Sequence, residues 1–224
     1  MIQDEFKEIF ARFGLSVEQV QARLTEIGLE GYSKLLVHPE AKRWTHFFYF
    51  AMSSLVLKNA GYILEIGTGN GVSTSVLAML FPNAAVYTID VGSDDPQWEH
   101  TWKRAHSSKY NIYAKNLSHK NIKVLEINSF FLPTLDLPKH FDLIFVDGDH
   151  RYPAVASDIS FAYSRLKGGG FLYMHDYDAD RKSIDVYHAV NWLGERVKEE
   201  VMFFPQYMNE KIQRTQEIAC LVKE

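Results

Sequence analysis

Several features are scarce in this sequence, and each scarcity excludes a class of protein. The one cysteine, Cys220, excludes an internal disulfide framework and a metal cluster built from cysteines. The formal charge is only −4 and no long run of like charge occurs, which argues against a nucleic-acid groove or an anionic membrane surface as the partner. The most apolar helical stretch, "HFFYFAMSSLVLK", is too short to span a bilayer and is typical of a buried helix.

The bulk composition predicts one globular unit with a large core. The chain has 224 residues, of which 46% are hydrophobic and 23% charged, and this suits one α/β domain with a helical extension. No internal repeat or linker interrupts it. The N-terminal stretch "MIQDEFKEIF" is acidic and amphipathic, unlike a signal peptide, so we expect a cytoplasmic protein.

Residues 1–60 are predicted to be helical. Ser16 and Gln19 have the spacing of a capping box at the start of a second helix, which Gly28 should end. A third helix is expected over residues 44–59. The first helix has one apolar stripe at helical spacing, formed by Phe6, Ile9, Phe10 and Phe13. We interpret residues 1–60 as a helical N-terminal cap and residues 61–224 as the catalytic domain.

From residue 62 onward, predicted strands alternate with predicted helices. One of these helices carries Val186, Val190, Leu193 and Val197 on one face. Such alternation predicts a mostly parallel sheet with right-handed crossovers, and the last two strands are spaced as an antiparallel pair. The expected strands cover residues 62–66, 85–90, 122–127, 141–146, 168–175, 200–208 and 217–224. The predicted fold is therefore α/β, with a seven-stranded sheet whose last strand is antiparallel.

A glycine-rich turn, "LEIGTGNGVS", follows the first predicted strand. A dinucleotide fingerprint would need its third glycine where Val72 stands, so the turn disfavours a nicotinamide dehydrogenase. A ligand with an amino acid end and a nucleoside, but no pyrophosphate, would suit a turn preceded by Glu65 and followed by Ser73. The glycines that allow the sharp turn and a close approach of ligand are Gly67, Gly69 and Gly71.

Acidic residues end three of the predicted strands. Asp90 follows the glycine turn by roughly twenty residues, where a carboxylate can bind a ribose diol, although an acid here can also simply cap a turn. Asp147 and Asp176 end two strands that we expect to be neighbours. Two adjacent carboxylates repel unless a cation or donor lies between them, which favours a divalent ion such as Mg²⁺. Alternatively, they bind backbone amides, His150 or Arg151 without metal.

Five blocks of the sequence occur in the order that is typical of class I S-adenosylmethionine-dependent methyltransferases. These blocks are "ILEIGTGNGVST", "VYTIDV", "VLEINSFF", "FDLIFVDGDHRY" and "LKGGGFLYMHDY", and they cover about residues 60–180. The chain most resembles the branch with small-molecule and sugar O-methyltransferases related to macrolide-tailoring enzymes. The resemblance implies a Rossmann-like fold with S-adenosylmethionine as cofactor.

The same resemblance assigns roles to individual residues. It implies that Asp90 binds the ribose and that Asn128 and Ser129 lie beside the adenine, although "EINSFF" is equally compatible with an ordinary strand-to-loop turn. Asp147 would also adjoin the cofactor. The remaining cofactor-binding residues implied are Glu65, Gly67, Thr68, Gly69, Gly71 and Ser73.

For catalysis, the resemblance implies a metal at Asp147 and Asp176 and a general base at His150. Relatives usually have an acid before the second aspartate, whereas this chain has His175, a ligand that suits transition metals better than Mg²⁺. An imidazole with a pKa near 6.5 is suited to removing a hydroxyl proton at neutral pH. The alternative is an exposed His150 that pairs with Asp149.

The sequence thus predicts a methyltransferase that acts on the oxygen of a hydroxylated small molecule, such as a sugar. Its predicted cofactors are S-adenosylmethionine and a divalent cation, without a nucleic-acid or membrane partner, and self-association is left open. An N-methyltransferase with the same cofactor site and a non-catalytic nucleotide-binding module remain alternatives. Trp98 and Trp102 are candidate walls of the substrate pocket, although two aromatics at helical spacing are more often core.

Overall fold

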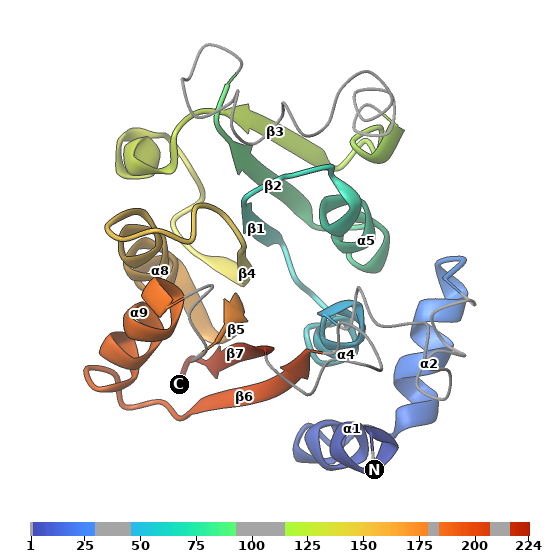
Figure 1. Cartoon of the computed structure of the whole chain (residues 1–224). Helices are drawn as coiled ribbons and strands as arrows, with labels where there is room; N and C mark the ends of the chain where they lie inside the picture. The colour runs from blue at the N-terminus through green and yellow to red at the C-terminus, as the bar shows by residue number, and fades with distance from the viewer. Residues whose placement is uncertain (1, 30–45, 93–114, 179–183, 207–215) are drawn as a thin grey trace.

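The computed structural model describes residues 2–29, 46–92, 115–178, 184–206 and 216–224 (Figure 1). A seven-stranded sheet with the order β3-β2-β1-β4-β5-β7-β6 runs through the centre. Its strands are β1 (Tyr62–Ile66), β2 (Ala85–Asp90), β3 (Ile122–Glu126), β4 (Phe141–Val146), β5 (Leu166–Tyr177), β6 (Val201–Gln206) and β7 (Gln216–Val222). Strands β1 to β5 are parallel to one another, and β7 is antiparallel to both β5 and β6. The predicted α/β fold with an antiparallel last strand is confirmed.

Helices cover both faces of the sheet (Figure 1). One face carries α1 (Ile2–Arg12), α2 (Val17–Glu26), α4 (His46–Val56) and α5 (Val72–Leu80), and the other carries η3 (Ser129–Thr134), α8 (Ala154–Arg165) and α9 (Ile184–Gly194). Along β4, Leu143 and Phe145 face the first layer, whereas Ile144 and Val146 face the second. Burial on both faces explains why this strand is an unbroken apolar run. Within the described ranges, no helix has the length and apolar character needed to cross a membrane.

The N-terminal helices α1, α2 and α4 form where local sequence signals predict them. The side chain of Ser16 accepts a hydrogen bond from the Gln19 amide at 3.3 Å, and the Gln19 side chain accepts one from the Ser16 amide at 2.7 Å, so the capping box forms. Gly28 follows α2 with a φ of +78°, as a helix stop requires. Three helix ends were predicted too late along the chain: α1 ends at Arg12, before Phe13, and α4 ends at Val56 and not at residue 59. Likewise, α9 ends at Gly194, so Val197 lies beyond the helix.

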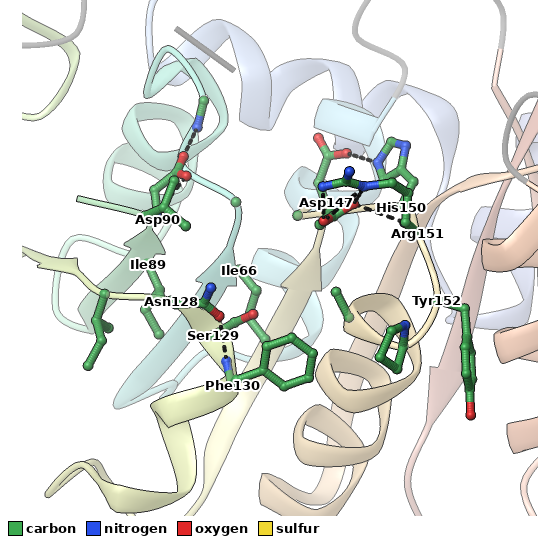
Figure 2. Close-up of a pocket in the computed structure, with 18 residues that line it drawn as sticks. Ile66, Ile89, Asp90, Asn128, Ser129, Phe130, Asp147, His150, Arg151 and Tyr152 are labelled. Carbon is green, nitrogen blue, oxygen red and sulfur yellow. Dashed lines mark hydrogen bonds and ion pairs between the residues drawn. The ribbon is translucent and has the colours of Figure 1, made fainter. Parts of the chain in front are cut away.

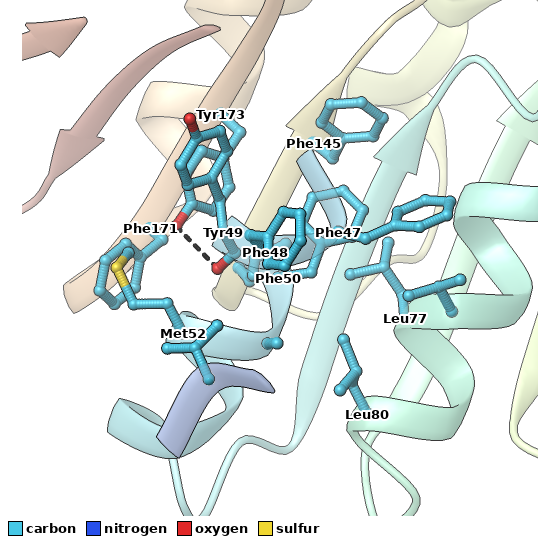
Figure 3. Close-up of a cluster of buried hydrophobic side chains, with 14 of the residues drawn as sticks. Phe47, Phe48, Tyr49, Phe50, Met52, Leu77, Leu80, Phe145, Phe171 and Tyr173 are labelled. Carbon is cyan, nitrogen blue, oxygen red and sulfur yellow. Dashed lines mark hydrogen bonds between the residues drawn. The ribbon is translucent and has the colours of Figure 1, made fainter. Parts of the chain in front are cut away.

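The N-terminal helices share one hydrophobic core with the sheet. Helix α4 is buried on all sides because it lies between the sheet and the helices α1 and α2, and its aromatic side chains fill that space (Figure 3). Phe50 meets Phe145 of β4 edge to face, with ring centroids 5.0 Å apart. The hydroxyl of Tyr49 donates to the carbonyl of Pro205 in β6 at 2.7 Å. The division into a cap and a catalytic domain at residue 60 therefore falls within continuous packing, and it stays a prediction.

Candidate active site

A cavity of about 770 Å³ opens at the carboxyl ends of β1, β2 and β4 (Figure 2). The strand order reverses between β1 and β4, which is the usual position of a ligand site in an open α/β sheet. Ser129 and the loop after β4 lie on one side of it, and Asp90 lies on the other. The predicted site residues that line the cavity are Gly67, Gly69, Asp90, Asn128, Ser129, Asp147 and His150.

The glycine turn brings the end of β1 against the end of β4. Gly67 has a φ of +101°, and a Cβ atom there would lie 2.1 Å from the carbonyl oxygen of Asp147. Only glycine permits this backbone approach. The amide of Gly67 donates to the carbonyl of Ile89 at 2.8 Å, which ties the turn to β2 as well. Gly71, with a φ of +75°, is the N-cap of α5.

Glu65 and Thr68 lie beneath the glycine turn and do not line the cavity. Glu65 is fully buried, and one carboxyl oxygen accepts hydrogen bonds from the hydroxyls of Thr74 and Thr88. Its other oxygen, Oε1, has no hydrogen-bond partner among the described residues. Burial raises the pKa of Glu65 to about 8, although the two threonine hydroxyls oppose the shift. Glu65 is therefore a neutral acid at pH 7 that supports the turn from below.

Ser73 contacts His46, which was not among the predicted site residues. Its hydroxyl lies 3.0 Å from Nε2 of His46, at the start of α4. The His46 ring is stacked on Phe145 and lies edge-on to His175, with centroids 5.2 Å apart in the second contact. Burial lowers the pKa of His46 to about 3, and the charge of His175 adds to this shift, so His46 is neutral. Nothing in its local sequence marks His46, because it begins an otherwise apolar helix.

Asp90 and Asn128 both cap backbone at the cavity edge (Figure 2). The carboxylate of Asp90 accepts hydrogen bonds from the amides of Gly69 and Val91, each at 2.9 Å. Burial raises the pKa of Asp90, and these amides oppose the shift. A carboxylate has about four lone-pair positions, so Asp90 can still accept hydrogens from a ligand. Asn128 accepts from the amide of Phe130 at 3.1 Å and thereby begins η3.

The predicted pairing of strand ends β4 and β5 is confirmed, and it gathers two acids and two histidines. Val146 is in register with Met174, so the side chains that follow each strand meet. Nδ1 of His175 lies 3.2 Å from a carboxylate oxygen of Asp147 and 3.1 Å from one of Asp176. His150 lies 3.4 Å from Asp147 and 3.6 Å from Asp176. Asp176 has a φ of +55°, a conformation that is uncommon for a residue with a side chain.

Electrostatic attraction within this cluster outweighs the cost of burial. Burial alone would raise the pKa of Asp147, but the charge of His175 and hydrogen bonds from His150 and His175 hold it well below its usual range. Burial would lower the pKa of His175, yet Asp147 and Asp176 raise it to about 10. Hydrogen bonding to Asp147 raises the pKa of His150 as well, with burial opposing. A protonated His175 therefore lies between two carboxylates.

Other sequence expectations around the cluster have mixed outcomes. Asp149 pairs with Arg151 at 2.6 Å, so the alternative pairing of Asp149 with His150 is wrong. The backbone amide of Tyr152 donates to Asp185 at 2.9 Å and ties this loop to α9. Trp98 and Trp102 lie outside the described residues. Asp158, an acid on the buried face of α8, was not among the predicted site residues.

The sequence profile of the methyltransferase domain family matches residues 64–177. An uncharacterized protein of Acanthamoeba polyphaga mimivirus is 34% identical over 129 residues, and the match covers 57% of this chain and 57% of that protein. Among solved structures, the O-methyltransferase from Bacillus cereus in complex with S-adenosylhomocysteine has a TM-score of 0.59 at 16% identity, covering 92% of this chain and 91% of that one. The O-methyltransferase TomG from Streptomyces achromogenes, in complex with S-adenosylmethionine, has a TM-score of 0.58 at 19% identity, with both chains covered completely. At identities of 16% and 19%, these two structures show only that the chain shares their fold.

The buried Glu65 predicts a specific dependence of stability on pH. The unfolded chain releases the Glu65 proton near pH 4.5, whereas the folded protein keeps it up to about pH 8. The free energy of unfolding should therefore fall as the pH rises between these values, relative to Glu65→Gln, by up to about 1.4 kcal/mol per pH unit. Urea unfolding at a series of pH values measures this difference. In the control Glu126→Gln, a change at the exposed end of β3, the free energy of unfolding should vary with pH as it does in the wild type. If Glu65→Gln also showed the wild-type dependence on pH, Glu65 would not be neutral in the folded protein.

Proposed function

This chain belongs to the methyltransferase domain family and has the fold of S-adenosylmethionine-dependent enzymes, and on that premise we propose that it methylates a hydroxyl oxygen of a small molecule. The observation that carries the proposal is one cavity with Asp90 on one side and the Asp147–His150 pair on the other. The first side suits a ribose, and the second suits removal of a proton. The formal net charge of the chain is only −4, without the positive excess typical of proteins that bind nucleic acid, and this supports a small molecule as the methyl acceptor.

The cavity suits S-adenosylmethionine in size and in polar groups. Asp90 retains lone pairs for a ribose diol, and Asn128 and Ser129 line the part of the wall proposed for the adenine. The space around Gly69 is open, since a Cβ atom there would meet nothing within 4 Å. The unpartnered oxygen of Glu65 lies beneath the turn proposed for the methionine part, together with the buried Thr68. In this proposal Gly67 and Gly71 shape that turn, and Ser73 supports it through His46.

When bound, S-adenosylmethionine supplies a methyl group attached to a positively charged sulfur. A lone pair of the acceptor hydroxyl forms the new bond to the methyl carbon, and the electrons of the breaking carbon–sulfur bond stay on sulfur. The hydroxyl proton must leave during this displacement. His150 is the proposed base, because it lines the cavity with a partly exposed ring and contacts Asp147. Asp147 orients this imidazole and stabilises its protonated form.

The residues beside His150 also have the chemistry of a divalent metal site. Asp147, His175 and Asp176 each offer one ligand atom, and the three atoms lie within 4.8 Å of one another. Two carboxylates with an imidazole favour Mn²⁺ or another transition ion over Mg²⁺. Such an ion would hold the acceptor oxygen and lower the pKa of its hydroxyl. Metal binding requires His175 to give up the proton that it holds between the two acids.

Asp90 supplies the first test of this function. Removing its carboxylate should weaken binding of S-adenosylhomocysteine by about 1–3 kcal/mol, because the ribose hydroxyls lose their acceptor. Isothermal calorimetry on Asp90→Ala measures the loss. The matched control is Asp136→Ala, which removes an exposed acid that does not line the cavity. Unchanged affinity for Asp90→Ala, or strong binding of NAD by the wild type, would remove the proposed cofactor site.

His150 supplies the second test, once labelled methyl transfer to a panel of sugars, phenols and amines has identified an acceptor. His150→Ala should lower turnover by roughly 10²–10⁴-fold with cofactor affinity near wild type. Since Asp147 raises the pKa of His150, wild-type turnover should rise with pH through a value above 6.5. His140→Ala, an exposed histidine before β4, is the control. A loss below about tenfold, with the pH profile unchanged, would rule out His150 as the base.

The metal site has its own test. Crystals soaked in Mn²⁺ should give an anomalous peak within about 2.0–2.4 Å of oxygens from both Asp147 and Asp176. Asp176→Asn should lose this peak while it retains S-adenosylhomocysteine binding, because Asp176 does not line the cofactor cavity. No peak at saturating Mn²⁺, with activity that survives chelation, would show that His175 takes the place of a metal between the acids.

A further inference from the structure

His46 is a polar side chain buried among aromatic rings at the start of helix α4. It is only 2% exposed. Its ring is stacked on Phe145 with centroids 5.4 Å apart, and it contacts Phe47 and Phe50 edge to face with centroids 4.6 and 5.3 Å apart. A phenylalanine would fill this space without the cost of burying a polar ring. The ring nitrogens of His46 therefore indicate a role beyond packing.

One ring nitrogen contacts the start of helix α5. Nε2 of His46 lies 3.0 Å from the hydroxyl of Ser73. Because Gly71 is the N-cap of α5, Ser73 lies in the first turn of the helix, where the glycine turn leads into it. At the other end of the glycine turn, Gly67 lies against the backbone of Asp147. The glycine turn is thus held at both of its ends, and His46 holds the second.

His46 reaches the glycine turn from a part of the chain that the family profile does not match. The profile covers residues 64–177, whereas α4 precedes this range and packs against α5. The contact between His46 and Ser73 joins residues 27 positions apart in the sequence. The N-terminal helices therefore contribute a side chain to the support of the site as well as a cover for the sheet.

We propose that His46 is a positioning residue for the amino acid end of the ligand, and that it acts by holding the hydroxyl of Ser73. The inference rests on the proposed function, which places the methionine part of S-adenosylmethionine over the glycine turn. A hydroxyl held by a ring nitrogen has its remaining hydrogen-bonding capacity fixed in direction, whereas a rotating hydroxyl must be ordered when the ligand binds. Loss of this hydrogen bond should therefore weaken the binding of ligands that have an amino acid end and spare those that lack it.

Calorimetry with two ligands tests this role, because S-adenosylhomocysteine has the amino acid end and 5′-methylthioadenosine lacks it. His46→Phe keeps an aromatic ring and removes the ring nitrogens, so its affinity for S-adenosylhomocysteine should fall about three- to tenfold, the effect of one hydrogen bond. Its affinity for 5′-methylthioadenosine should stay near the wild-type value. His46→Gln loses the ring but keeps an amide that can donate to Ser73 or accept from it, so it should bind S-adenosylhomocysteine more tightly than His46→Phe does.

A second histidine–serine pair on the same helix provides the matched control. Nε2 of His119 also lies 3.0 Å from a hydroxyl of α5, that of Ser75, and His119→Phe should leave both affinities unchanged. Ser73→Ala should show the same selective loss as His46→Phe, and combining the two should add no further loss. Because Ser73 is only half-buried, Ser73→Ala keeps the test usable if His46→Phe does not fold.

A purely structural role for His46 predicts the opposite pattern. If the ring acts only by packing, His46→Phe should be the milder change and His46→Gln should weaken both ligands equally, and that result would overturn the inference. Equal losses of the two ligands in Ser73→Ala would overturn it as well. If the wild type binds neither ligand, the proposed function fails and this inference with it. If the wild type binds both and the variants do not distinguish them, only this inference fails.

Discussion

The close approach of the backbone at the ends of β1 and β4 is the constraint on which the site depends. The amide of Asp147 donates to the carbonyl of Ile66 at 2.8 Å, which continues the parallel ladder one residue past the strand. Gly67 then lies against the carbonyl of Asp147, where no side chain would fit. This contact brings the glycine turn and the acidic end of β4 to one cavity. The proposed cofactor and the proposed proton acceptor are adjacent for the same reason.

Charge compensation then holds the acidic end of β4 in place. Asp147 is approached by His150 from its own loop and by His175 from β5, while the neutral His46 fills the space behind His175. The cluster can bind a proton at His175 or a metal ion at the same atoms, but not both at once. His175 therefore decides how the two acids are balanced, while His150 contacts both of them from the loop after β4.

Much of this arrangement could be predicted from the sequence because its signals are local. The capping box at Ser16, the glycine turn and the apolar runs are each recognised from their own periodicity or turn chemistry. The alternation of strands with helices implies a parallel sheet, in which the carboxyl ends of the strands lie at the same edge. His46 and Asp158 carry no such signal. His46 acquires its neighbours from α4 packing against β4, and Asp158 acquires its burial from α8 packing against η3, which are both contacts between distant segments. The end of α9 before Val197 was missed because an apolar residue that packs beyond a helix has the same spacing as one within it.

A crystal structure with S-adenosylhomocysteine would show whether one cavity holds the cofactor between Asp90 and His150. We expect the ribose hydroxyls within about 2.6–3.2 Å of the Asp90 carboxylate, the purine beside Ser129, and the sulfur on the side of the cavity that faces His150. A ligand bound outside this cavity, or bound in it with Asp90 turned away from the ribose, would rule out this arrangement.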